Sequence, residues 1–181
     1  MPPPDLDAWL AQPSARTFHR RVAQASQDAL WAATGTVRLS DARMLGRLVR
    51  LRIPGEPPQI TFRELLRQDP FTVLEEGERY SLSGLVGRIW TLRRDYPRLE
   101  GAEAFRQWHR SGTAKVLFAH WVEPAGQGRS AIVSEVRVGV ADFQARLGLR
   151  LVRPLISTFE SLIGSEALAL SARRAVEAEA G

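Results

Sequence analysis

Two long segments of alternating side chains, Thr113 to Val122 and Ser130 to Val140, dominate the second half of this sequence. Alternation with a period of two is typical of β-strands, and the proline- and glycine-rich loop between the segments favours a hairpin. One face of each segment is the more apolar, and we expect a helix to cover it. This face carries Ala114, Val116, Phe118, His120 and Val122 on the first strand and Ile132, Ser134, Val136, Val138 and Val140 on the second.

The period becomes helical after Asp142. Apolar residues then recur every three or four positions at Val152, Ile156, Phe159 and Ile163. This spacing predicts a C-terminal helix, which is the expected element long enough to cover the sheet. Pro154 lies inside the pattern and has no amide hydrogen to donate, so the helix should bend or restart there. A straight helix through residues 150–156 is not expected.

Shorter elements precede the hairpin. The sequence predicts a first strand over 16–23, a helix over 27–34 capped by Ser26 and ended by Gly35, a second capped helix from Ser40 to Arg52, a short helix opened by a Thr61–Glu64 capping box, strands over 71–75 and 79–90, and an amphipathic stretch over 102–108. We read residues 1–15 as an N-terminal arm and 16–181 as a single domain.

Composition sets outer limits on function. The 181 residues include no cysteine, so disulfides and sulfur-ligated metals are excluded. No run of side chains is long and apolar enough for a membrane span, and the N-terminal residues lack the pattern of a secretory signal, so we expect a cytoplasmic protein. The net charge of +5 comes almost wholly from arginine, which we read as a compositional habit more than as a nucleic-acid footprint.

Several segments together resemble the START-related helix-grip superfamily, which contains lipid-transfer domains, polyketide cyclases and pollen-allergen proteins. The segments that carry the resemblance are Arg79–Trp90, Gly112–Val116 leading to Val122–Pro124, Ser134–Val138 running into Asp142, and Val152–Ile156. The resemblance implies an α+β helix-grip fold: a curved antiparallel sheet wrapped around a long C-terminal helix, with two short helices after the first strand.

The resemblance also implies an apolar cavity between the sheet and the C-terminal helix. We expect a hydrophobic or amphipathic small molecule as the partner there, with no cofactor, and leave the ligand identity and the oligomeric state open. The expected ligand-binding residues are Tyr80, Leu82, Val86, Trp90, Val116, Phe118, His120, Ile132, Ser134, Val136, Val152, Ile156 and Phe159.

Two weaker candidates concern catalysis. His120 falls on the apolar face, where a neutral imidazole can bond a ligand or act as a general base. The plainer interpretation is a core histidine satisfied by the backbone or by Ser134 across the hairpin. Lys115 is expected opposite Glu135 or Arg137, either as an orienting patch or, more simply, as an exposed ion-pair ladder. With His120 or Lys115 as acid or base, the alternative function is a cyclase- or aromatase-like enzyme.

A third hypothesis is an interaction module for anionic surfaces. Arg43, Arg47 and Arg50 share one face of the helix expected over 40–52, and a basic amphipathic helix can lie on an anionic membrane. No metal site is expected, because His19, His109 and His120 share no ligand spacing.

Overall fold

The computed structural model describes residues 3–91, 95–140 and 142–181, leaving aside the side chains of residues 52, 153, 155–157, 159, 160 and 164. Its elements run α1 (Asp7–Leu10), β1 (Ala15–Ala23), α2 (Gln27–Thr34), α3 (Arg43–Arg52), α4 (Phe62–Leu65), β2 (Thr72–Gly77), β3 (Tyr80–Gly87), α5 (Ala102–Gln107), β4 (Ala114–Gly126), β5 (Arg129–Val140), α6 (Phe143–Leu162), a π-helical turn η1 (Ile163–Ala167) and α7 (Leu168–Ala180). This is the predicted α+β order.

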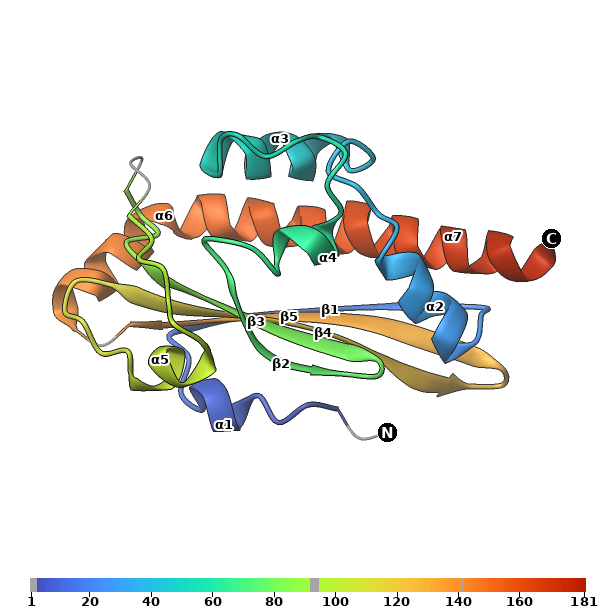
Figure 1. Cartoon of the computed structure of the whole chain (residues 1–181), viewed down its shortest axis with the longest axis horizontal. Coiled ribbons are helices and arrows are strands. Elements are labelled where there is room, and N and C mark those ends of the chain that lie inside the picture. Colours follow the sequence, from blue (N-terminus) through green and yellow to red (C-terminus); the bar gives the residue numbers. More distant parts are fainter. Residues whose placement is uncertain (1–2, 92–94, 141) are drawn as a thin grey trace.

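The strands form one five-stranded antiparallel sheet in the order β1-β5-β4-β3-β2. The continuous helix α6–η1–α7 crosses one face of it, and α3 lies over the outer side of that helix (Figure 1). α2 and α4 lie on the helix side, whereas α1 and α5 lie against the opposite face (Figure 1). The predicted architecture, a sheet gripped against a long C-terminal helix, is therefore confirmed.

The helix-facing side of the sheet holds the larger core. Val116, Ile132 and Val136 pack there with Leu149 and Leu168 of the terminal helix, among other apolar residues. The alternation in the hairpin thus predicted the covered face correctly, because a strand directs successive side chains to opposite faces.

The opposite face is also buried, which the sequence pattern did not predict. Leu82, Leu117 and Val133 form a second core there with Trp9 of the N-terminal arm and Phe105 of α5. The sequence predicts either an orienting polar patch or an exposed ion-pair ladder on this face, and the burial of Glu135 and Arg137 contradicts the exposed ladder. The arm and α5 cover this face because both are short amphipathic segments whose aromatic residues need apolar contact.

Local capping explains several helix boundaries. The Ser26 side chain accepts a hydrogen bond from the Ala29 amide, and Thr61 and Glu64 form the predicted capping box. The helix predicted from Ser40 begins instead at Arg43. Its first amides, at Met44 and Leu45, donate to the Glu166 carboxylate at 3.0–3.2 Å, so a side chain from η1 replaces the expected local cap.

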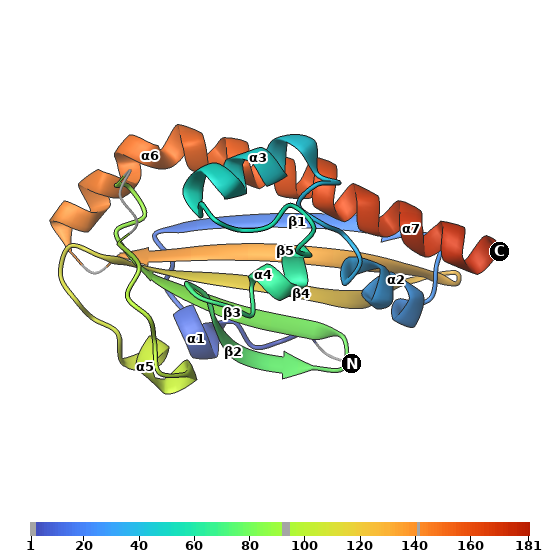
Figure 2. The ribbon, with the colours of Figure 1, turned by 45° about the horizontal axis from the view of Figure 1, so that its top comes forward.

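Pro154 does not break the terminal helix. α6 continues as an α-helix from Phe143 to Leu162 with Pro154 inside it, and the helix changes direction along α6 (Figure 2). The predicted restart is wrong and the predicted bend is present. The change to π-helical geometry at Ile163–Ala167 had no sequence signal.

The packing of α5 against the sheet leads to a stability prediction. An ideal Cβ on Gly84 would lie 2.6 Å from the Phe105 ring, and that ring is fully buried. We expect Gly84→Ala to lower the free energy of unfolding by about 1–3 kcal/mol, the usual cost of overpacking. Urea denaturation measures this. Phe105→Leu should make the Gly84→Ala change less costly; strictly additive effects would show that the ring is not the obstacle.

Candidate functional site

A row of polar side chains crosses the helix-facing side of the sheet, one from each strand. Directly paired positions place His19 of β1 opposite Ser134, Ser134 opposite His120, His120 opposite Ser81, and Ser81 opposite Glu76 of β2. We call these five residues the polar row. Neighbouring strands lie about 4.8 Å apart, so each member lies next to the following one.

One end of the polar row is satisfied within the chain. The Ser81 hydroxyl donates to a Glu76 carboxylate oxygen at 3.2 Å, and Glu76 also accepts from the Arg67 guanidinium at 2.8 Å. The edge of the sheet at β2 is therefore a closed polar cluster near solvent.

The other members lack such partners. The Ser134 hydroxyl and Nε2 of His19 are buried with no hydrogen-bond partner, and so is the hydroxyl of Ser83, which lies opposite Phe118 one step further along the strands. A buried polar atom left unpaired costs about 1–3 kcal/mol, and native folds leave few of them. These atoms need hydrogen-bond partners from outside the chain.

His120 occupies the middle of the polar row. Protein surrounds its ring, yet the residue keeps a partly accessible surface. Burial first, and then the positive charge of Arg63, lowers the pKa of His120 to about 4. The imidazole is therefore neutral at pH 7.

The predicted bond between His120 and Ser134 is not formed. The two residues do lie opposite each other, as expected, but the Ser134 hydroxyl remains without a partner. Burial and the charge of Arg63 account for the lowered pKa of His120, and no hydrogen bond from the described part of the chain contributes to it. Ser134 therefore does not satisfy His120, and the alternative that a backbone group satisfies this core histidine stays a prediction.

Arg63 brings a cation to this side of the sheet. Its guanidinium donates to the Trp31 carbonyl at 2.8 Å and to the Thr34 hydroxyl at 2.6 Å, and lies 4.2 Å from the centre of the Trp31 ring. Burial and then the nearby Arg67 lower the pKa of Arg63. Sequence reasoning missed this residue, because nothing in the sequence shows that α4 packs against α2.

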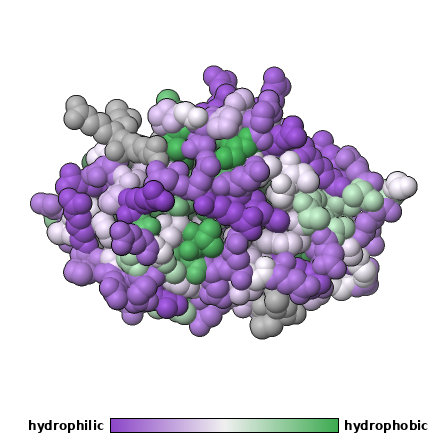
Figure 3. Space-filling view, viewed as in Figure 1, coloured by the Kyte–Doolittle hydropathy of each residue, from purple (hydrophilic) through white to green (hydrophobic). Residues whose placement is uncertain are grey.

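Apolar side chains frame the polar row. Phe118 is half-buried and meets Phe71 edge-on at a centroid distance of 5.4 Å. Trp90 packs on Gly148 of α6 so closely that a Cβ there would lie 2.5 Å from the ring. Apolar surface is visible over the middle of the sheet, below α4, and hydrophilic side chains surround it (Figure 3).

The structure brings most of the predicted ligand-binding residues to one side of the sheet. Residues on the helix-facing side are Trp90, Val116, Phe118, His120, Ile132, Ser134 and Val136. Val152 is half-buried on α6. Ile156 and Phe159 were also predicted to bind the ligand, and their side chains lie outside the described part of the chain.

Tyr80, Leu82 and Val86 lie on the opposite side. They pair with Trp121, Ala119 and Lys115, whose side chains face α1 and α5. The alternation of side chains showed which residues of β3 share a face, but not which face of the sheet they share with β4. Gly87, at φ 137°, then redirects the chain, so Trp90 reaches the helix side although it shares nominal parity with these three residues.

The predicted constellation of Lys115, Glu135 and Arg137 also lies on that opposite side. Lys115 pairs with Gly139 and not with Glu135 or Arg137, because the hairpin turn is centred on Gln127 instead of Ala125 or Gly126. Its ammonium donates to the Arg106 carbonyl at 3.1 Å and lies 4.7 Å from the centre of the Phe105 ring. Burial lowers the pKa of Lys115.

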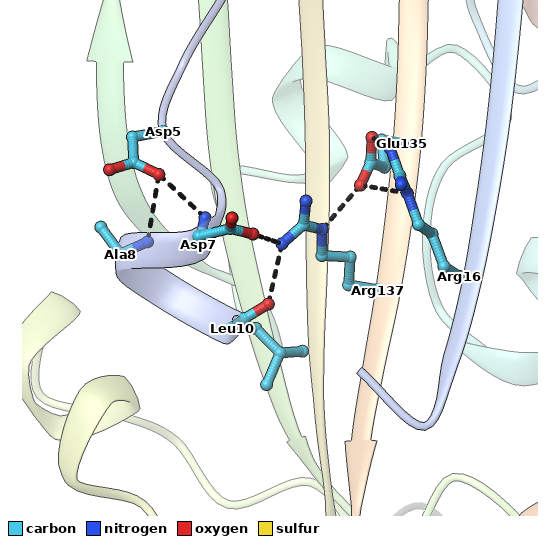
Figure 4. A network of polar contacts seen from close by, with 7 residues as sticks. All are labelled: Asp5, Asp7, Ala8, Leu10, Arg16, Glu135 and Arg137. Atoms are coloured by element: carbon cyan, nitrogen blue, oxygen red, sulfur yellow. Dashed lines mark hydrogen bonds and ion pairs between the residues drawn. The ribbon is translucent and has the colours of Figure 1, made fainter. Parts of the chain in front are cut away.

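Glu135 and Arg137 form a buried network beneath the N-terminal arm (Figure 4). Arg137 donates to Glu135 at 2.6 Å and to Asp7 at 2.5 Å, and Arg16 pairs with Glu135 at 2.8 Å. Burial works to lower the pKa of Arg137, and the two carboxylates outweigh it, so that pKa lies above its ordinary value. This network ties the arm to the sheet and lies away from the polar row.

Metal-binding clusters and membrane-spanning helices are both absent from the described residues. Within residues 3–91, 95–140 and 142–181, no three His, Asp or Glu side chains are grouped so that they could hold a metal ion. No helix in the same ranges has the length and apolar character needed to cross a membrane. An open groove of about 570 Å³ lies between the end of β1 and α7, near Val22 and Val176, and none of the predicted site residues lines it.

Comparisons with known proteins give only distant matches. No known protein family matches the chain, and no curated protein matches it. The terminal oxygenase of carbazole 1,9a-dioxygenase from Nocardioides aromaticivorans matches at 12% identity over 99% of this chain and 54% of its own, with a TM-score of 0.43.

Two smaller proteins match to a similar degree. The Zhui aromatase/cyclase from Streptomyces sp. R1128 shows 12% identity over 88% of this chain and 94% of its own, with a TM-score of 0.38. Norcoclaurine synthase from Thalictrum flavum shows 14% identity over 92% and 86%, with a TM-score of 0.35. Values this low assign neither a family nor an activity to the chain.

Proposed function

We propose that the protein binds an amphipathic small molecule between the helix-facing side of the sheet and the terminal helix. The observation that carries this proposal is the set of buried, unpaired polar atoms on Ser134, Ser83 and His19. Each of them lowers stability unless something outside the chain bonds to it, as a ligand or an ordered water does. Ligand pockets are mostly apolar with a few such polar groups.

The chemistry of these groups limits the polar part of the ligand. Serine hydroxyls and the neutral imidazole of His120 each offer a donor and an acceptor but no charge. They suit a hydroxyl, carbonyl or similar neutral group. The apolar part of the ligand would then lie along Phe118, Val116 and Val136, which flank the polar row on the same side.

The geometry gives less support to a cyclase- or aromatase-like enzyme. A general base works best when its pKa lies near the working pH, and the pKa of His120 is about 4. Lys115 lies on the other side of the sheet, so it cannot act on the same substrate as His120. We therefore propose binding, not acid–base catalysis, as the function of this site.

Two measurements test the proposal. The uncharged lipophilic dye Nile red should bind to the purified protein with increased fluorescence, and mass spectrometry of an organic extract should detect a copurified amphipathic compound. A protein that binds no apolar dye and yields no compound would contradict the proposal.

Ser134→Ala tests the polar row directly. Because the Ser134 hydroxyl has no partner, its removal should leave the free energy of unfolding unchanged or raise it by about 1 kcal/mol. It should weaken binding of the copurified compound by roughly fivefold, the equivalent of one lost hydrogen bond. Calorimetric titration and urea denaturation measure the two effects.

Ser81→Ala is the matched control, because that hydroxyl is already bonded to Glu76. It should destabilise the protein by about 1 kcal/mol. If Ser134→Ala is equally destabilising and leaves ligand affinity unchanged, the Ser134 hydroxyl plays no part in binding.

A further inference from the structure

The first half of α6 exposes an apolar stripe on its outer side. Phe143, Leu147 and Leu151 are 77%, 50% and 76% exposed, and their spacing of four residues stacks them along one face of the helix. The inner face of the same turns is packed, with Ala145 and Leu149 buried. The exposed stripe is therefore not needed to hold the helix on the sheet.

Arginines accompany this stripe without any acidic residue. Residues 143–159 contain Arg146, Arg150 and Arg153 and no Asp or Glu, and residues 43–52 contain four arginines and no Asp or Glu. Those seven account for the positive charge of the chain, since the remaining 18 of its 25 basic residues are outnumbered by 20 acidic ones.

α3 adds to the same region. It packs alongside α6 and η1, as both ribbon views show (Figures 1 and 2). Arg43, Arg47 and Arg50 are exposed, as predicted, and Leu51 is 81% exposed at the end of the helix. The region thus combines exposed apolar side chains with a cluster of arginines on two adjacent helices, and the nearby Glu166 carboxylate is bonded to the first amides of α3.

We propose that this basic apolar surface docks the protein on an anionic lipid membrane. The surface comprises Phe143, Leu147 and Leu151 with Arg146 and Arg150 on α6, and Arg43, Arg47, Arg50 and Leu51 on α3. Helices of this kind lie in the membrane interface, where apolar side chains enter the acyl boundary and arginines meet lipid phosphates. This proposal is independent of ligand binding, because it uses the outer side of α6.

The charge selects a membrane over other partners. Nucleic acid would pair with the arginines but would leave the apolar stripe in water. A second copy of the chain would bring two arginine-rich surfaces together, which is unfavourable without intervening acids. A layer of anionic headgroups above an apolar interior complements both features together.

Cosedimentation with vesicles tests the proposal. The protein should bind vesicles of phosphatidylcholine mixed with phosphatidylserine, bind vesicles of phosphatidylcholine alone weakly, and lose binding as salt rises. Arg146→Gln/Arg150→Gln should weaken binding roughly thirtyfold, at about 1 kcal/mol per arginine. Leu147→Ser/Leu151→Ser should reduce it to a comparable extent, whereas Val176→Ser/Arg173→Gln, at exposed positions on α7, should bind like the wild type.

Circular dichroism and unfolding midpoints should be unchanged in all three variants, because the substituted side chains are exposed. Failure of the folded wild-type protein to bind phosphatidylserine vesicles, equal binding to both vesicle types, or wild-type binding by the two α6 variants would each overturn the proposal. So would a wild-type dimer in analytical ultracentrifugation that Leu147→Ser/Leu151→Ser dissociates.

Discussion

Glu135→Ala is expected to lower the free energy of unfolding by about 3–5 kcal/mol. The Glu135 side chain is only 2% exposed, and it is paired with both Arg16 and Arg137. Removing one partner of a buried ion pair leaves the other charge uncompensated, which costs more than the pair itself contributes. Arg137 would keep only Asp7 and the Leu10 carbonyl. Urea denaturation at neutral pH measures the loss.

Glu123→Ala is the matched control for this prediction. Glu123 lies in the same hairpin and also pairs with an arginine of β1, Arg20, at 2.7 Å, but both side chains are about one-third exposed. Its removal should cost about 1 kcal/mol or less. Equal losses in the two variants would mean that burial of Glu135 does not decide the outcome.

The buried imidazole of His120 should make stability fall steeply in mild acid. Its pKa is about 4 in the folded protein and 6.5 in the unfolded chain, so between these values the unfolded chain binds more protons. The contribution of neutral His120 is complete above about pH 6.5 and is lost as the pH falls toward 4. Over this whole pH interval, the free energy of unfolding falls by about 3 kcal/mol.

The measurement is the free energy of unfolding as a function of pH for wild type and His120→Gln. The variant should lack the wild-type slope between about pH 6.5 and 4. His109→Gln is the control, since that ring is exposed on the surface and should leave the slope in place. If His120→Gln keeps the wild-type slope, the slope comes from other titrating groups. The His120 ring would then not be buried in the folded protein.

Local sequence signals predicted the element order well. The helix caps, the turn residues and the two hydrophobic periods act over a few residues, and the structure confirms the helix capped by Ser26, the short helix at Thr61 and the hairpin with its helix-facing side. The proline bend also follows from a local steric rule. The alternation of β4 and β5 was enough to place His120 and Ser134 on the helix side.

Relations between distant segments were not predictable in the same way. The register of the hairpin depended on a turn displaced by one or two residues, and this moved Lys115 away from its expected partners. The pairing of β3 with β4 placed Leu82 and Val86 in the core that faces α1 and α5. A shift of one residue in strand pairing moves a side chain to the opposite face of the sheet. The alternation within one strand does not show how the neighbouring strand pairs with it.

The sequence by itself determined which segments form helices and strands, and which face of the hairpin lies against the C-terminal helix, because these depend on periodicity and on caps within one segment. The tertiary structure alone decided that His19, Ser134, His120, Ser81 and Glu76 form one row, that Arg63 lies near it, and that the N-terminal arm bonds to Arg137 beside the buried Glu135. Those features arise from strand register and from packing between segments far apart in the chain, where no local pattern specifies which side chains will meet.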